Sequence, residues 1–292
     1  MAVDAGTGEI RWEQKSVIMP LTLAADDEHT YFHDGTKLVC LDRRTGQQQW
    51  ATEPIARKPK FISEFAPVLV VYDGVVLFAG GAALGSRRGG GDSMIAVDAS
   101  TGKTLWVAEH PPSGYRSPED ILVTGGLVWT AATTSGRLSG VFTGRDLHTG
   151  EVKREFAPDV DTYWFHHRCY RGKATDDYLL MSRTGIEFVD YREEHWNIHH
   201  WVRGACLYGV MPCNGLVYAP QHPCACYPEA KLYGFNALKA ATDATRERRN
   251  LPGARDDRLL KGPAFGSPLS AADSQAADSW PTYRGDAARS GS

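Results

Sequence analysis

The chain has 292 residues, of which 42% are hydrophobic and 10% aromatic, and this is enough to bury a substantial core. Its 30 glycines and 16 prolines suit an architecture with many tight turns better than one built from long helices. A net charge of −3 gives no overall attraction to nucleic acid or to an anionic membrane, so neither is expected as a partner. The sequence shows no signal peptide and no membrane span.

A repeated pattern, Asp-x-x-Thr-Gly-x-x-x-Trp, is the main organising feature of the chain. A fourth copy begins at Asp146 but has Arg154 in place of the Trp, and a fifth keeps only the strand end at Asp190. Successive copies begin 38, 56, 48 and 44 residues apart. Such periods are typical of propeller blades and of helical HEAT or armadillo repeats. The three complete copies occupy 4–12, 42–50 and 98–106.

Short apolar runs between the copies favour the propeller over the helical repeats. Each run is bounded by Gly or Asp, and none has a sustained helical period. We therefore expect each blade to be a four-stranded antiparallel sheet. The clearest runs are 68–72, 74–80, 94–97 and 126–130.

The repeat specifies a strand, a turn and a second strand. A strand is expected to end at Asp98, whose carboxylate can accept hydrogen bonds from the backbone that follows, while Gly102 can take a positive φ. The next strand is expected to start at Lys103. Trp106 is too large for one blade to bury, so it should pack on the neighbouring blade and contribute roughly 2–3 kcal/mol. The same structural docking is expected of Trp12 and Trp50.

The extended pattern Ala-x-Asp-x-x-Thr-Gly-x-x-x-Trp resembles the tryptophan-docking motif of the quinoprotein-like, PQQ-like β-propeller repeats. It is complete at 2–12 and 96–106, and Cys40 replaces the Ala in a third copy. The resemblance covers roughly residues 1–240 and implies an all-β propeller, a partial ring of five or six blades. Residues 208–238 also resemble a segment of large bacterial propeller proteins described as PQQ-binding-like.

The sequence divides into three parts. Residues 1–238 are assigned to the blades, and 239–278, rich in Ala, Asp, Arg, Ser and Pro, to a linker. Residues 279–292 resemble the Trp-Pro-x-x-Arg-Gly segment that opens PQQ-like propellers, so they start a further array or supply a ring-closing strand. Because the chain starts inside a copy of the motif, the remaining strands of that blade are expected from upstream or from the C-terminal end.

Four cysteines lie within 21 residues. Their spacing does not match the Cys-x₂₋₄-Cys pairs of zinc sites, and no metal site is predicted. In an exported protein, we expect one of the first two to form a disulfide with one of the last two, and free thiols are the alternative. PQQ alcohol dehydrogenases place two adjacent cysteines beneath the cofactor, and this sequence has a residue between its last two. The four are Cys206, Cys213, Cys224 and Cys226.

Aromatic and imidazole side chains cluster in two further segments, where we place a hypothetical cofactor-binding site near one face of the propeller. The alternative is that each histidine is an ordinary loop or strand-end residue. No residue maps onto the Ca²⁺ ligands, the base or the Arg of a quinone dehydrogenase, so no catalytic residue is assigned. PQQ with Ca²⁺ stays open as a cofactor. The candidate residues are Trp164, His166, His167, His199 and His200.

Docking motifs without catalytic motifs favour a non-catalytic propeller that serves as a binding or scaffold module in a bacterial, exported protein. This resembles the outer-membrane assembly lipoprotein type, and it implies a periplasmic location and a protein partner bound through blade-edge loops. One alternative is a PQQ-dependent quinoprotein oxidoreductase or a cofactor-binding sensor. Another is a carbohydrate- or polymer-binding region of a larger enzyme, suggested by 8 Trp and 12 Tyr.

Overall fold

A computed structural model gives the fold of Met1–Lys239, which forms one compact unit. The predicted linker lies almost entirely outside the described residues, and the segment 279–292 lies wholly outside them. The part of the chain that the structure describes contains no helix, so it has none that could cross a membrane. The described residues are 1–55, 67–81, 92–111, 120–131, 140–160, 170–182, 185–206, 208–221, 232 and 234–242.

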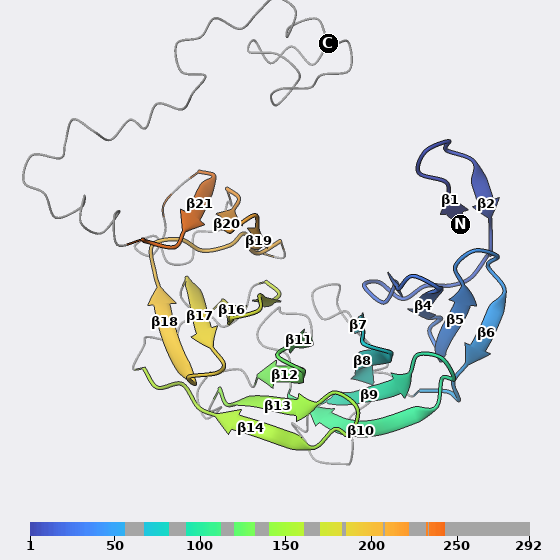
Figure 1. The fold of residues 1–292 in the computed structure, drawn as a ribbon, viewed down its shortest axis with the longest axis horizontal. Coiled ribbons are helices and arrows are strands. Elements are labelled where there is room, and N and C mark those ends of the chain that lie inside the picture. Colours follow the sequence, from blue (N-terminus) through green and yellow to red (C-terminus); the bar gives the residue numbers. More distant parts are fainter. Residues whose placement is uncertain are drawn as a thin grey trace, which may run out of the picture. The chain divides into compact units, whose positions relative to one another are not determined.

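The strands form antiparallel sheets, each built from consecutive strands in sequence order (Figure 1). The prediction of an all-β protein is confirmed, and four of the sheets have the predicted four strands. The first sheet joins β1 (Ala2–Val3) and β2 (Ile10–Trp12), and the second contains β3 (Ala24–Ala25), β4 (His29–His33), β5 (Leu38–Asp42) and β6 (Gln48–Ala51). The third contains β7 (Val68–Tyr72), β8 (Val75–Gly81), β9 (Asp92–Asp98) and β10 (Thr104–His110), and the fourth β11 (Leu122–Thr124), β12 (Leu127–Ala131), β13 (Phe142–Asp146) and β14 (Val152–Phe156). The fifth contains β15 (Lys173–Ala174), β16 (Tyr178–Met181), β17 (Ile186–Asp190) and β18 (His195–His199), and the last β19 (Met211–Cys213), β20 (Leu216–Ala219) and β21 (Asn236–Lys239).

Strand β8 shows why these sheets stack on one another. Every residue of β8 is buried, which accounts for its unbroken apolar sequence. Because successive side chains of a strand point to opposite faces, Val76 and Phe78 enter one hydrophobic cluster, and Leu77 and Ala79 enter another. The first cluster is shared with the sheet of β3–β6 and the second with the sheet of β11–β14. Neighbouring sheets therefore pack face to face, as propeller blades do.

The Asp turn between the last two strands of a sheet folds as the sequence predicts. The Asp98 carboxylate accepts hydrogen bonds from the backbone N–H groups of Ser100 (3.1 Å) and Thr101 (2.8 Å), and Gly102 has a φ of 71°. The side-chain hydroxyls of Ser100 and Thr101, together with these N–H groups, hold the pKa of Asp98 below its usual value. Equivalent backbone contacts form at Asp4, Asp42, Asp146 and Asp190.

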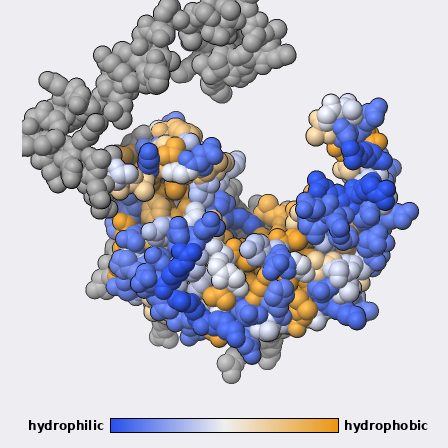
Figure 2. All heavy atoms as spheres, viewed as in Figure 1, coloured by the Kyte–Doolittle hydropathy of each residue, from blue (hydrophilic) through white to orange (hydrophobic). Residues whose placement is uncertain are grey.

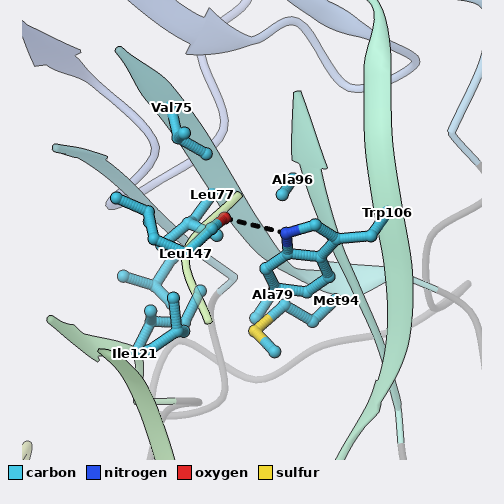
Figure 3. Close-up of a cluster of buried hydrophobic side chains, with 10 residues drawn as sticks. Val75, Leu77, Ala79, Met94, Ala96, Trp106, Ile121 and Leu147 are labelled. Carbon is cyan, nitrogen blue, oxygen red and sulfur yellow. Dashed lines mark hydrogen bonds between the residues drawn. The ribbon is translucent and has the colours of Figure 1, made fainter. Parts of the chain in front are cut away.

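The interblade packing predicted for the repeat tryptophans is present. Trp106 Nε1 donates a hydrogen bond to the carbonyl oxygen of Leu147, at 2.8 Å, in the turn of the next sheet (Figure 3). The indole lies against Gly150, where an added Cβ would come within 2.7 Å of the ring. Each Trp therefore requires two features of the turn in the next sheet: a backbone carbonyl oxygen that accepts the indole N–H, and a glycine whose missing side chain leaves room for the ring. Trp12 uses Arg43 and Gly46 in the same way, and Trp50 uses Ala99 and Gly102.

The fourth copy, which lacks the Trp, makes an equivalent contact with a different donor. The guanidinium of Arg154 donates to the carbonyl oxygens of Tyr191 (3.2 Å) and Arg192 (2.9 Å), the residues that follow Asp190. Glu194 occupies the position that glycine holds in the other turns and keeps a positive φ of 58°. A side chain at this position occupies the space where the indole of a Trp would pack. The absence of the Trp at position 154 and the absence of the Gly at position 194 are therefore coupled. Arg154 also lies 3.5 Å from the Glu194 carboxylate.

Replacing Trp106 with Ala should lower the free energy of unfolding by about 3–5 kcal/mol, because it empties the space between two sheets and removes the bond to Leu147. Denaturant titration measures the change. The exposed Gln48→Ala, on strand β6, is the control and should change stability by no more than about 0.5 kcal/mol. Similar small effects in the two variants would contradict the assigned role of Trp106.

Gly150→Ala should cost about 1–3 kcal/mol more than Gly126→Ala. Both glycines have a φ near 75°, but an added Cβ meets the Trp106 ring only at Gly150, and Gly126 has nothing within 4 Å. Denaturation of both variants, with and without Trp106→Ala, isolates the clash. In the Trp106→Ala background the extra cost at Gly150 should disappear, and its persistence would refute the clash.

Candidate functional face

The two ends of each sheet differ in the connections that they carry. In an antiparallel meander, successive connections alternate between the two ends of the sheet. One end, which we call the turn edge, carries connections of two to six residues, such as 73–74 and 99–103. The other end, the loop edge, carries connections of four to sixteen residues, such as 52–67 and 157–172. Long connections on a rigid scaffold are where binding residues are usually found, so the loop edge is the candidate functional face.

Buried polar side chains gather at the loop edge. Of the nine buried polar or charged residues among those described, eight lie in loop-edge connections or within one residue of a strand end at that edge. The ninth, Thr124, lies at the turn edge. Burying a polar group is costly unless it is hydrogen-bonded, so these residues should have specific partners. The eight are Thr22, His33, His110, Asp120, Thr130, Ser182, Glu187 and Arg203.

His110 and Asp120 link three successive sheets at this edge. His110 ends β10 and is 1% exposed. Its Nδ1 lies 2.7 Å from the carbonyl oxygen of Pro111, and its Nε2 lies 2.8 Å from that of Asp120. The Asp120 carboxylate accepts a hydrogen bond from the backbone N–H of Gly172 at 3.0 Å. Both side chains therefore contact backbone at points where the chain passes from one sheet to the next.

Thr22 and His33 fix the connection before β3 in a similar way. The Thr22 hydroxyl donates to the carbonyl oxygen of Met19 at 2.8 Å and accepts from the backbone N–H of His33 at 3.2 Å. Nδ1 of His33 accepts a hydrogen bond from the backbone N–H of Gly35, which places the ring proton on Nε2. The imidazole stacks on Phe78 with a centroid distance of 4.6 Å. This histidine is thus a structural link to the next sheet.

A third group lies around the connection between β16 and β17. Tyr170 is 1% exposed, and its hydroxyl donates to the carbonyl oxygen of Gly185 at 2.9 Å. The Ser182 hydroxyl donates to the carbonyl oxygen of Tyr170 at 3.4 Å. Two buried charged residues, Glu187 and Arg203, belong to the same edge. As at the other two junctions, buried polar side chains hold the backbone of loop-edge connections in place.

The structure describes only two of the five proposed cofactor-binding residues. His199 is the last residue of β18 and is half-buried, and His200 follows it on the surface. Burial lowers the pKa of His199 below its usual value, with a smaller effect in the same direction from His200. Trp164, His166 and His167 lie outside the described residues, so their proposed proximity to His199 stays a prediction.

The cysteines fall into two groups. Cys40 is fully buried in β5. Cys206 is half-buried and Cys213 is exposed. Their predicted partners, Cys224 and Cys226, lie outside the described residues, so the disulfide stays a prediction.

The described residues contain no cluster of three His, Cys, Asp or Glu side chains that could hold a metal ion. Calcium takes six to eight oxygen ligands, several of them carboxylates. The buried Asp120 carboxylate is engaged with the Gly172 backbone at 3.0 Å, so it is already committed to a structural contact.

Three of the described aromatic side chains stand out at the loop edge because they are exposed. Trp201 is 66% exposed and Tyr208 is 80% exposed, and both lie in the connection between β18 and β19. Phe235, in the connection between β20 and β21, is 69% exposed. Trp and Tyr are the residues most enriched among the energetically dominant contacts of protein interfaces. Trp201 directly follows the candidate residues His199 and His200, whereas Tyr208 was not predicted from the sequence. Exposure of this kind cannot be predicted from residue type alone.

Antiparallel sheets that pack through a Trp on the Gly turn of the next sheet define a PQQ-like β-propeller array. The chain belongs to this family, since the family model described as outer membrane protein assembly factor BamB matches residues 1–157. The recognition made from the repeat motif is therefore confirmed. The curated proteins include no match to the chain.

Solved structures with a similar fold include both a BamB and quinoprotein dehydrogenases. BamB from Moraxella catarrhalis is 16% identical, with a TM-score of 0.48, and the match covers 75% of this chain and 62% of that one. Quinohemoprotein alcohol dehydrogenase from Comamonas testosteroni is 13% identical, with a TM-score of 0.48 and coverages of 75% and 48%. A europium-containing methanol dehydrogenase is 13% identical, with a TM-score of 0.47 and coverages of 81% and 62%. The chain thus spans less than two thirds of each of these proteins.

Stability should fall as the pH drops below about 6.5, and His199 should account for part of that fall. The folded state holds its pKa below the unfolded value, so the unfolded chain binds the proton first and is favoured at lower pH. The free energy of unfolding, measured at intervals between pH 7.5 and 5.5, should decline less steeply in His199→Asn and in His199→Gln than in the parent protein. An unchanged slope in both variants would refute this role.

Proposed function

We propose that this chain is a non-catalytic PQQ-like propeller module that binds a protein partner through its loop edge. The observation that carries the proposal is the use made of the buried polar groups. The side chains of Thr22, His110, Asp120, Tyr170 and Ser182 contact the backbone of loop-edge connections. Side chains that hold the loop backbone in this way order the loops before a partner binds, which lowers the entropic cost of association.

Catalysis would require a different arrangement. A general base must reach the proton that it removes, and a nucleophile must lie within hydrogen-bond distance of its base. His110 contacts two backbone carbonyl groups, and Asp120 contacts a backbone N–H, so both side chains hold loop-edge connections in place. The described part of the loop edge therefore supports binding better than chemistry.

The exposed aromatic residues of the loop edge are the proposed contact points. Trp201 and Tyr208 offer large apolar surfaces with a polar tip, which suits an interface that forms in water. We also propose an extracytoplasmic location, which the description of the matching family as an outer membrane protein assembly factor supports. Under this proposal the partner is a protein of the same compartment.

Site-specific photo-crosslinking in the complete gene product, expressed in its own host, tests the proposed face. A photoreactive phenylalanine replaces Trp201 or Tyr208 at the loop edge and, as matched controls, Thr101 or His148 at the turn edge. The loop-edge positions should give a cross-linked protein of one discrete mass, and the turn-edge positions should give none. Products from the turn edge alone, or none from any position, would overturn the proposal.

A second measurement separates this function from a quinoprotein dehydrogenase. The complete protein is titrated with pyrroloquinoline quinone in the presence of Ca²⁺, and the quinone absorbance and Trp fluorescence are followed. The proposal predicts no saturable change in either signal. Stoichiometric binding would instead support the oxidoreductase or sensor.

A further inference from the structure

The connection before β3 contains a turn with an unfavourable backbone conformation. Residues 19–22 form this turn, which is closed by a hydrogen bond of 3.2 Å from the backbone N–H of Thr22 to the carbonyl oxygen of Met19. Leu21, at the third position, has a φ of 63°. A Pro at the second position and a positive φ at the third are typical of a type II turn, where the third residue is usually Gly. For a residue as large as Leu this φ is costly, because its Cβ comes close to the backbone.

Leu21 differs from the other residues that share this conformation. Four of the described residues other than Gly have a positive φ. Asp73 and Asn214 lie in two-residue hairpin turns before a Gly, which tolerate it, and Glu194 lies in an Asp turn. All three belong to the turn edge. Leu21 is the apolar member of the four, and it lies at the loop edge.

The surrounding structure holds this turn in place from two sheets. The backbone N–H of Met19 donates to the carbonyl oxygen of His33 at 2.9 Å, and the Thr22 hydroxyl contacts the backbone of both residues. The carbonyl oxygen of Leu21 accepts a hydrogen bond from the backbone N–H of Leu69 in β7, at 3.3 Å. A strained conformation persists where neighbouring contacts fix it in this way.

Core packing does not account for the Leu21 side chain. It is 54% exposed, and it lies outside the hydrophobic clusters that the described residues form. A Gly at this position would relieve the strain without removing a side chain from the core. Folding therefore gives no reason for a Leu here. Strained residues of this kind concentrate at binding sites, where the side chain repays the strain.

The apolar exposure of this part of the chain is confined to the same connection. Hydrophilic side chains cover most of the sheet of β3–β6 in the view of Figure 2. Residues 16–25 contain no charged side chain, so a surface that covers them should be apolar and uncharged. Within residues 13–55, the exposed large apolar side chains are Val17, Ile18, Leu21 and Leu23.

We propose that Leu21 is a further contact of the loop edge with its protein partner, and that its side chain enters an apolar recess of that partner. This inference rests on the function proposed above. Leu21 and the exposed Tyr208 both lie three residues before the first residue of an inner strand, β3 or β19. Because the turn is already rigid, the Leu21 side chain is presented without a further ordering cost on binding.

Three substitutions at position 21 separate the backbone from the side chain. Gly and Asn accept a positive φ, so Leu21→Gly and Leu21→Asn should melt at or above the temperature of the parent protein. In the complete gene product in its own host, both should reduce cross-linking from a photoreactive phenylalanine in place of Trp201 by about tenfold or more. Leu21→Met keeps an apolar side chain and should retain the cross-link. Tyr72→Ala, 48% exposed at the turn edge, is the matched control and should also retain it.

The outcomes distinguish this inference from the proposed function. Lower melting temperatures in both Leu21→Gly and Leu21→Asn would assign Leu21 to folding and contradict the inference. Undiminished cross-linking in these variants, or an equal loss in Tyr72→Ala, would also contradict it. A cross-linked product of twice the mass of the chain would identify a second copy in place of a different protein. If the parent protein itself gives no product, the proposed function fails first.

Discussion

The packing of an indole ring on the backbone of the next turn is the interaction on which the rest of this structure depends. Each turn has to supply two groups at once. The residue after the Asp supplies a carbonyl oxygen, such as that of Leu147, which accepts the indole N–H. Three residues further on, a glycine such as Gly150 leaves the space that the ring fills. Because the Asp carboxylate fixes the turn in a single conformation, both groups are correctly placed before the Trp arrives.

This arrangement separates the tasks of the two edges of each sheet. The turn edge sets the spacing of the blades through short connections of two to six residues, so the loop edge is free to vary in length and composition. The polar residues buried at the loop edge extend the same principle, because His110 and Asp120 hold backbone where the chain passes from one sheet to the next. A rigid frame with ordered connections suits the recognition of a partner, and the exposed Trp201 and Tyr208 are the side chains best placed for it.

The sequence predicts the repeated parts of the fold well, since those parts are encoded locally. The strand ending at Asp98, the turn to Gly102 and the packing of Trp106 all follow from one short pattern. The role of Arg154 was missed, although Glu194 in place of the turn glycine was a signal in the sequence that the indole had been replaced. The partners of His110 and Asp120 could not be predicted, because they depend on where long connections bring residues of different sheets. The proposed cofactor-binding role of Trp164, His166 and His167 stays a prediction, and so does the disulfide that involves Cys224 or Cys226.

The coupling between the docking side chain and the turn residue is the central claim, and the fourth junction offers the most direct test. Arg154→Trp, Glu194→Gly and the double variant are compared by denaturant titration. Arg154→Trp alone should destabilise the protein, because its ring meets the side chain at position 194 and the bonds to Tyr191 and Arg192 are lost. In the double variant the Trp regains its usual site, so the two changes should show a favourable coupling of about 1–3 kcal/mol. Strictly additive effects would contradict the account.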